Sequence, residues 1–286
     1  MHLGDKKLNC ILAKMRGIKY NEALVMAMNN KMEVVVLGSG MYVPPKRPGA
    51  THRNPSGYAV VLKDEILIFD FGFGNLRQMS KAGLDPTRIT NIFITHLHLD
   101  HLGDLAAILF AFHFDIKPKT GRLRIFGPKG FKAFFQKMLK AYHPWTRPDG
   151  YSLQVEDIRE GRTVDGGAWT LSVQAVPHSI TANAYRLEYK GKSFCYTGDT
   201  AYDERIASFA KNADVFVLEC TLPGPEALYG HMTVPQSLRL AEQSGCRNAV
   251  LTHLSEEAES VLAKKKLSKS KKPKILVAQD LMRIAV

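Results

Sequence analysis

Short runs of apolar residues recur along the chain, at the length and with the flanking turn residues that are typical of β-strands. Two pairs of these runs, separated by Lys63–Glu65 and by Lys190–Lys192, predict β-hairpins. The predicted strands are Val34–Leu37, Tyr58–Leu62, Ile66–Phe69, Ile89–Ile94, Arg122–Phe126, Leu153–Ile158, Trp169–Val176, Tyr185–Tyr189, Ser193–Tyr196, Val215–Leu218, Ala249–Leu251 and Ile275–Ala278.

Other stretches repeat their apolar residues at helical intervals and end at glycine or in a polar segment. The predicted helices are Asn75–Ala82, Asp104–Phe112, Lys129–Lys140, Ile206–Lys211, Val234–Ser244 and Glu256–Lys266. In each half of the chain, grouped strands are followed by strands that alternate with helices. This order predicts an α/β fold, a four-layer αβ/βα sandwich in which two packed sheets carry helices on their outer faces.

Length and composition favour one large layered domain rather than two small ones. Nothing within residues 32–286 reads as a long flexible linker, so we expect a single domain there. Residues 1–31 precede the abrupt strand start at Met32 and form a basic extension: a short helix, a disordered lead or the product of a mis-assigned start codon. The chain shows no signal peptide or membrane span, and its four cysteines lack CxxC spacing, which together favour a cytoplasmic protein.

The net charge of +12 is unevenly distributed. Residues 1–31 carry six basic and two acidic groups, and Lys264–Lys274 contains seven lysines and no acid, so these two segments account for all but one of the net charges. Residues 116–148 nevertheless contain nine basic residues and no acidic one. The aromatic stripe of the helix in this stretch predicts core contact. The lysines on its other face are either simply solvated or attract phosphate, namely Lys129, Lys132, Lys137 and Lys140.

The sequence THLHLDHLGD, residues 95–104, follows directly on a predicted strand. On extended backbone His96 and His98 point to the same side, whereas Asp100 and His101 come after the chain has begun to turn into a helix. One pair could hold one metal ion and the other pair a second. Imidazole and carboxylate together suit zinc, with manganese and iron as competitors. A surface loop that is rich in histidine by chance is the simpler alternative.

Three further polar residues each follow an apolar strand, where a ligand would be expected: His178, Asp199 and His253. A single histidine in such a place is more often satisfied within the interior than bound to metal. With the run at 95–104, however, the sequence HLHLDHLGD resembles the HxHxDH signature of the metallo-β-lactamase fold hydrolases, and the ribonuclease Z branch is the most similar. The resemblance extends from about Met32 to His253.

The resemblance implies a dinuclear metallohydrolase with the same four-layer fold. It implies that His96, His98 and His178 hold one ion and that Asp100, His101 and His253 hold the other, with Asp199 bridging the two. It also implies two Zn²⁺ ions, or Mn²⁺ or Fe in their place, which share a bridging hydroxide that Asp100 helps to orient. Asp70 would support the loop that carries the metal ligands.

Glu219 and His231, in LECT and GHMT, resemble the phosphodiesterase branch of this family. There the histidine contacts the scissile phosphate and helps to protonate the leaving oxygen, while the acid orients it. The alternative is that His231 only caps the helix that begins near Val234.

Only twenty residues separate His178 from Asp199, so the long arm with which ribonuclease Z often grips transfer RNA is absent. The expected substrate is therefore a phosphodiester, either the 3′ end of an RNA or a small or cyclic molecule, and the four lysines of the basic helix could contact a nucleic acid. An ester, lactone or aryl sulfate hydrolase and a non-catalytic RNA-binding protein are the alternatives. The sequence does not decide between a monomer and a homodimer.

Overall fold

The computed structural model describes residues 31–41, 48, 50–114, 119–226, 230–265 and 273–286. Residues Met32–Val286 form one compact unit. Apart from Lys31, the predicted basic extension lies outside the described residues, and so does most of the lysine-rich run at Lys264–Lys274.

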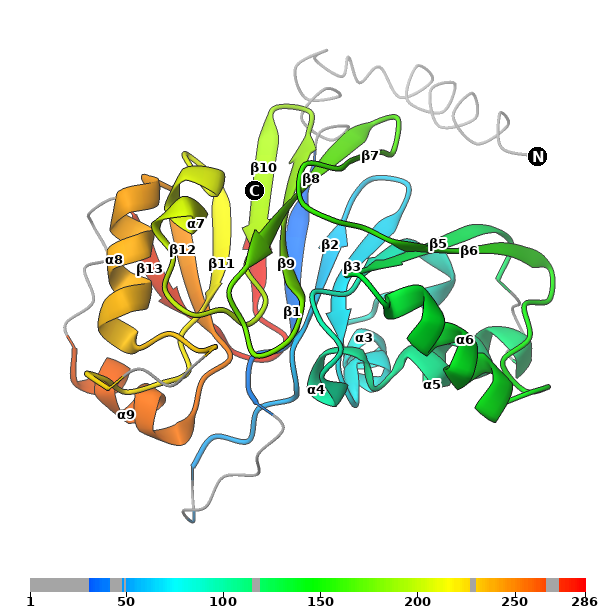
Figure 1. Cartoon of the computed structure of the whole chain (residues 1–286), viewed down its shortest axis with the longest axis horizontal. Coiled ribbons are helices and arrows are strands. Elements are labelled where there is room, and N and C mark those ends of the chain that lie inside the picture. Colours follow the sequence, from blue (N-terminus) through cyan, green and yellow to red (C-terminus); the bar gives the residue numbers. More distant parts are fainter. Residues whose placement is uncertain (1–30, 42–47, 49, 115–118, 227–229, 266–272) are drawn as a thin grey trace, which may run out of the picture. The chain divides into compact units, whose positions relative to one another are not determined.

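Two seven-stranded sheets form the centre of this unit (Figure 1). The first has the order β14-β1-β2-β3-β4-β5-β6, in which the pairs from β14 to β3 are antiparallel and those from β3 to β6 are parallel. Its strands are β1 (Glu33–Gly38), β2 (Gly57–Val61), β3 (Ile66–Phe71), β4 (Ile89–Phe93), β5 (Gly121–Gly127), β6 (Tyr151–Asp157) and β14 (Arg283–Ala285).

The second sheet has the order β13-β12-β11-β10-β9-β8-β7, with the pairs from β13 to β10 parallel and those from β10 to β7 antiparallel. Its strands are β7 (Thr163–Asp165), β8 (Trp169–Val176), β9 (Ala182–Tyr189), β10 (Lys192–Tyr196), β11 (Val215–Glu219), β12 (Asn248–Thr252) and β13 (Lys274–Val277). Each sheet therefore has a parallel and an antiparallel half.

A core of apolar and aromatic side chains fills the space between the sheets. The Phe93 ring lies at its centre. Its centroid is 5.2 Å from those of Phe69 and Phe126, and 6.0 Å from that of Trp169, whose ring is nearly perpendicular to it. All four side chains are buried. Because successive residues of a strand face opposite sides, these strands also supply the apolar residues of the outer layers.

Helices cover the outer face of each sheet (Figure 1). The first sheet carries α3 (Asn75–Lys81), α4 (Leu99–Leu102), α5 (Leu105–Phe114) and α6 (Phe131–Ala141), and the second carries α7 (Glu204–Phe209), α8 (Val234–Ser244) and α9 (Glu256–Lys264). The predicted four-layer αβ/βα sandwich is confirmed. The aromatic stripe of α6 makes core contacts as expected, since Phe131 and Phe135 are buried against the first sheet.

The predicted strands and both predicted hairpins are present, with ends that differ by a few residues. The predicted helix at Ile206–Lys211 begins earlier, because the Asp203 side chain accepts a hydrogen bond from the backbone at the start of α7. The sequence did not predict β7, β14 or α4, which are only three or four residues long and show no readable period.

The carboxyl ends of β4, β8, β10, β11 and β12 point the same way, and the residues that follow them form the candidate site. Parallel strands place their ends at one edge of a sheet, so polar residues far apart in sequence meet there. None of the helices within the described ranges is long and apolar enough to cross a membrane.

Candidate metal centre

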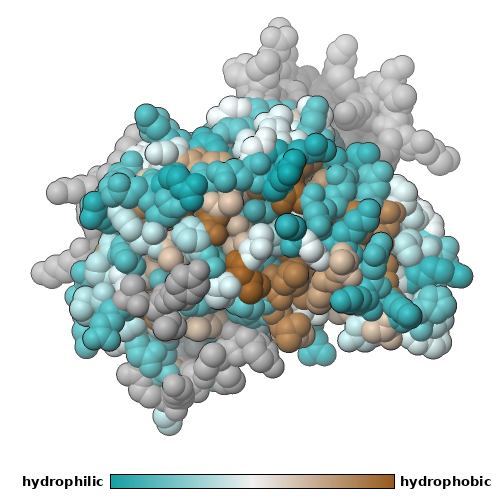
Figure 2. Space-filling view, viewed as in Figure 1, coloured by the Kyte–Doolittle hydropathy of each residue, from teal (hydrophilic) through white to brown (hydrophobic). Residues whose placement is uncertain are grey.

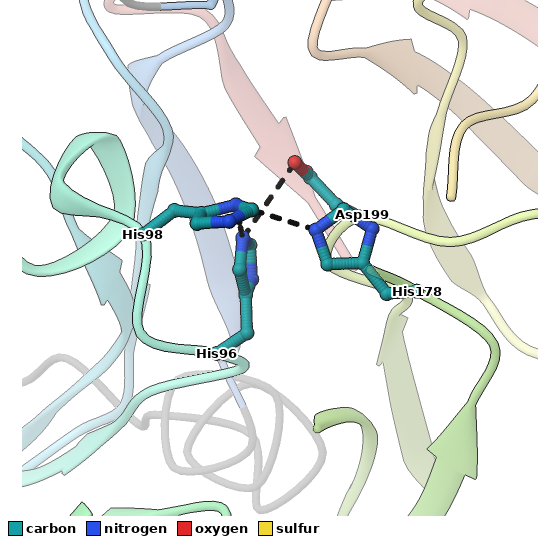
Figure 3. Close-up of side chains that lie close together, drawn as sticks. All are labelled: His96, His98, His178 and Asp199. Atoms are coloured by element: carbon teal, nitrogen blue, oxygen red, sulfur yellow. Dashed lines mark hydrogen bonds and ion pairs between the residues drawn. The ribbon is translucent and has the colours of Figure 1, made fainter. Parts of the chain in front are cut away.

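Three imidazoles and one carboxylate converge at the end of β4 (Figure 3). His98 Nδ1 lies 3.0 Å from His96 Nε2 and 3.3 Å from His178 Nε2, and Asp199 Oδ2 lies 3.7 Å from His96 Nε2. Nitrogen lone pairs repel one another at such distances unless a proton or a cation lies between them. A group of three nitrogens and one oxygen this close together suits a tetrahedral cation such as zinc.

In His96 and His178, the hydrogen bond of the outer ring nitrogen fixes which nitrogen faces the centre. His178 Nδ1 donates to the Gly230 carbonyl oxygen at 2.7 Å, and His96 Nδ1 donates to Thr95 Oγ1 at 2.9 Å. A proton on Nδ1 leaves the lone pair on Nε2, the atom that faces the other donors.

A second group lies beside the first and shares Asp199 with it. Asp199 Oδ1 is 3.2 Å from His101 Nε2, and Asp199 Oδ2 is 3.4 Å from His253 Nε2. Asp100 Oδ2 completes the group, 3.7 Å from His101 Nε2 and 3.5 Å from His253 Nε2. Asp199 is therefore the one residue whose carboxylate reaches donors of both groups.

Two buried polar atoms in this second group have no hydrogen-bond partner among the residues that the structure describes: His101 Nε2 and Asp199 Oδ1. An unpaired buried polar atom is costly, and a native protein seldom leaves one without a reason. A cation between the two atoms would satisfy both. The donor set and these two atoms fit a metal ion at each group.

Burial and charge act in opposite directions on these groups. Burial lowers the pKa of His96 well below its ordinary value, which keeps that imidazole neutral, as a ligand must be. Burial would also lower the pKa of His101, but the negative charges of Asp199 and Asp70 outweigh it and raise that pKa. Burial would raise the pKa of Asp199, but the neighbouring imidazoles hold it well below its usual range.

Asp70 lies behind the histidines and organises them. Its buried carboxylate accepts hydrogen bonds from the Thr95 amide and hydroxyl, from His101 Nδ1 and from the Tyr196 hydroxyl. Asp70 and His253 also have positive φ angles, 54° and 53°. A non-glycine residue in this conformation is strained, and the surrounding hydrogen bonds must hold it. These contacts fit the supporting role that the resemblance implies for Asp70.

Glu219 and His231 form a hydrogen-bonded pair between His231 Nδ1 and Glu219 Oε1, next to both donor groups. The His231 ring is 5.3 Å from that of His178 and 5.8 Å from that of His253. Glu219 also accepts from the Thr221 hydroxyl and the Thr200 amide.

The hydrogen bond between His231 and Glu219 acts on the pKa of both side chains. Burial would lower the pKa of His231, but the hydrogen bond and charge of Glu219 outweigh it and raise that pKa. Burial raises the pKa of Glu219, and the hydrogen bond from His231 acts against this rise. The helix cap near Val234 is the Thr233 side chain, so the alternative that His231 merely caps this helix is wrong.

The loops that carry Asp199 and His231 pass so close to Thr95 and His178 that only glycine fits. At Gly198 (φ 61°) a Cβ atom would lie 2.6 Å from Thr95 Cβ. At Gly230 (φ 88°) it would lie 2.8 Å from His178 Nδ1. Both contacts are shorter than a side chain tolerates, and both φ angles disfavour any residue but glycine.

The structure brings together all nine residues that the sequence singled out for metal binding and catalysis. They are His96, His98, Asp100, His101, His178, Asp199, Glu219, His231 and His253. The four lysines Lys129, Lys132, Lys137 and Lys140 lie elsewhere, on or beside α6.

Thr221 belongs to no motif of the sequence, yet its hydroxyl accepts a hydrogen bond from His253 Nδ1 at 2.8 Å and donates one to Glu219. The only signal in the sequence was its position two residues after the glutamate at the end of β11.

Figure 2 shows hydrophobic residues gathered near the centre of the face, over α4, among mostly hydrophilic surroundings. Leu99, in α4 between the donors His98 and Asp100, is 61% exposed.

Comparison with known proteins agrees with this geometry. Residues 66–254 match the family described as the β-lactamase superfamily domain. The chain belongs to the β-lactamase superfamily. Within the superfamily, it is 30% identical to a ribonuclease Z from Thermococcus onnurineus, over 78% of this chain and 84% of the relative. It is 27% identical to a ribonuclease Z from Methanothermobacter thermautotrophicus, over 89% of this chain and 97% of the relative.

Solved structures of the superfamily share the fold. The YhfI protein of Bacillus subtilis matches with a TM-score of 0.72 at 20% identity, over 90% of this chain and all of that one. The short form of human tRNase Z matches with a TM-score of 0.68 at 23% identity, over 88% and 98% of the two chains. With the sequence relatives, these findings make the chain a metal-dependent hydrolase of the ribonuclease Z type.

Proposed function

We propose that this protein is a phosphodiesterase that cleaves RNA with two divalent cations, zinc first among them, at the site formed by the two donor groups. The first cation would be held by His96, His98 and His178, the second by Asp100, His101 and His253, and Asp199 would contact both. Divalent cations in such a site would lower the pKa of water and stabilise negative charge on a phosphate oxygen.

One observation carries the phosphodiesterase proposal, the pairing of His231 with Glu219 at the edge of both donor groups. The bond to Glu219 keeps a proton on Nδ1 and leaves Nε2 for the substrate. A protonated Nε2 can donate to a phosphate oxygen and then pass its proton to the leaving oxygen of the ester. Hydrolysis of a phosphodiester needs such an acid because an alkoxide is a poor leaving group.

Asp100 is more exposed than the other donors of the second group. Its side chain is 19% exposed, whereas those of Asp199 and His253 are each 3% exposed. Its Oδ2 faces His253. We infer that its second oxygen accepts a hydrogen bond from the attacking water and orients it toward the phosphorus.

RNA is the proposed substrate because sequence relatives that match most of the chain are ribonucleases Z. The twenty residues between His178 and Asp199 form β9, β10 and their short connections, with no inserted arm. Any grip on the body of an RNA must therefore come from another part of the molecule.

Hydrolysis of bis(p-nitrophenyl) phosphate tests the proposed chemistry. We expect turnover that a chelator abolishes and that zinc or manganese restores. For an RNA phosphodiester, whose alkoxide leaving group needs a proton, His231→Ala should lower kcat by about 10² to 10⁴, because general acid catalysis contributes that much. For bis(p-nitrophenyl) phosphate the loss should be smaller, because nitrophenolate leaves readily without a proton. The metal content of the purified variant should equal that of the unmodified protein, since His231 acts on the substrate.

His52→Ala is the matched control, because it removes an exposed imidazole from a loop that we assign no role. It should leave kcat unchanged. Full activity of His231→Ala would contradict the assigned role. Faster hydrolysis of a lactone or an aryl sulfate than of any phosphodiester would instead assign the protein to another class of hydrolase.

A further inference from the structure

Three exposed aromatic rings lie next to one another at the end of α5 that is farther from the metal centre. Phe110, Phe114 and Trp145 are 50%, 51% and 54% exposed. The ring centroids of Phe110 and Phe114 are 4.6 Å apart, and those of Phe114 and Trp145 are 6.1 Å apart. Large aromatic side chains seldom remain this exposed together unless they meet a partner.

Exposed basic residues lie close to Trp145 in the chain and on the neighbouring helix α6. Lys140, at the end of α6, and Arg147 are exposed on either side of Trp145 in the chain. Lys132 and Lys137 are exposed on the same helix. Residues 116–148 contain nine basic residues and no acidic one, and the acidic residues that flank this stretch in the chain are Asp115 and Asp149. The aromatic rings and these cations are referred to below as the α5–α6 surface.

We propose that the α5–α6 surface binds a single-stranded segment of the RNA substrate. Exposed aromatic rings beside basic residues are the combination with which proteins bind single strands, because bases stack on the rings and the phosphates lie against the cations. The inference rests on the proposed function, and it identifies which part of this armless protein holds the RNA outside the metal centre.

The position of the surface fits a strand that leads to the metal centre. α5 directly follows α4, the helix that carries Asp100 and His101, and both lie on the outer side of the first sheet (Figure 1). From Leu105 to Phe114 a helix rises about 13 Å at about 1.5 Å per residue. This distance corresponds to about four nucleotides at the spacing of a stacked strand.

A second copy of the chain is a less suitable occupant. In a twofold dimer the same patch faces itself, so Lys140 and Arg147 would approach the same cations of the partner. Like charges in an interface are unfavourable, and the nine basic residues of 116–148 outnumber the two flanking acidic residues, Asp115 and Asp149. A polyanion has the complementary charge.

Binding of a fluorescein-labelled oligouridylate to full-length, metal-loaded His231→Ala protein tests the inference, because this variant should bind RNA without cleaving it. Phe114→Ala and Trp145→Ala should each weaken binding about tenfold. Trp145→Tyr should retain most of the affinity because it keeps a ring. Lys140→Ala with Arg147→Ala should lower the slope of log affinity against log salt by about 1.4, because each cation that neutralises a phosphate of a single strand contributes about 0.7 to that slope.

Lys81→Ala with Lys211→Ala is the matched control, since it removes two exposed charges from α3 and from the end of α7. It should leave the slope unchanged. Unchanged affinity of the ring variants, or no RNA binding by the His231→Ala protein, would overturn the inference. So would a change from dimer to monomer in the ring variants, seen by sedimentation, while RNA affinity stays constant. Turnover of bis(p-nitrophenyl) phosphate by the unmodified protein reports the proposed chemistry separately.

Discussion

At the scale of single residues, Thr221 connects the two functional parts of the site. Its hydroxyl accepts a hydrogen bond from His253 Nδ1 at 2.8 Å and donates to Glu219 Oε1 at 2.7 Å. Glu219 in turn holds His231. One buried hydroxyl therefore orients both a candidate metal ligand and the partner of the candidate general acid. Such supporting contacts fix the tautomer and the direction of a metal-binding imidazole.

Replacing Thr221 with valine should weaken metal binding. The branched side chain keeps its shape but cannot form either hydrogen bond, so His253 Nδ1 and Glu219 Oε1 are each left with one partner fewer in the interior. We expect the affinity for zinc to fall about 10- to 100-fold, measured by competition with a chromogenic chelator.

Thr221→Ser retains the hydroxyl and is the control, with metal affinity close to that of the unmodified protein. If valine and serine behave alike, the hydroxyl has no part in orienting His253.

At the scale of elements, α8 shows how local sequence sets the position of a site. Thr233 and Gln236 form a reciprocal capping box at its start, and Gly245 ends it in the left-handed conformation with φ 62°. Inside the helix, the Ser237 hydroxyl donates to the backbone carbonyl of Glu219. The cap lies two residues after His231, and the helix also holds the end of β11.

Thr233→Ala should lower the free energy of unfolding by about 1 kcal/mol, because the amide of Gln236 would no longer have its side-chain acceptor. Urea denaturation monitored by circular dichroism measures this change. Thr233→Ser keeps the acceptor oxygen, so its free energy of unfolding should fall by only a fraction of that amount. Equal decreases in the two variants would show that the buried methyl group of Thr233, rather than the cap, stabilises the start of α8.

At the scale of the whole molecule, the candidate metal centre joins the two halves of the fold. The residues that follow β4 supply His96, His98, Asp100 and His101, and the loops of the second sheet supply His178, Asp199 and His253. Bound cations would therefore hold both sheets at one edge, where buried imidazoles and carboxylates otherwise face one another.

Removing the metal should lower the thermal stability of the protein. A ligand that binds only the folded state stabilises it by about 2.7 kcal/mol when present at one hundred times its Kd. We expect the unfolding midpoint to fall when a chelator is added, and to recover with excess zinc, in a calorimetric scan.

The variant His96→Ala with His178→Ala is the control. It lacks two donors of the first group, so the chelator should shift its midpoint less. A midpoint of the unmodified protein that does not respond to the chelator would contradict a structural contribution from the metal.

Local sequence predicts most of the strands and helices, though not β7, β14 or α4, and it identifies most of the residues expected to carry the chemistry. Period and capping are local properties: the boundaries of α8 follow from an apolar period between Thr233 and Gly245. The run at 95–104 predicted metal binding because its donors are close in the chain, and strand ends identified the remaining donors. The resemblance to ribonuclease Z divided these donors between two ions, and all of them meet in the structure.

Only the tertiary structure decided how distant residues act on one another. That β14 pairs with β1 is invisible locally, because the pairing joins Arg283 to Val35 across most of the chain. The hydrogen bonds of Thr221 and Asp70 depend on how strands of both sheets end side by side. The exposure of Phe114 and Trp145 likewise follows from packing, since periodicity shows which residues share a face but not which face remains uncovered.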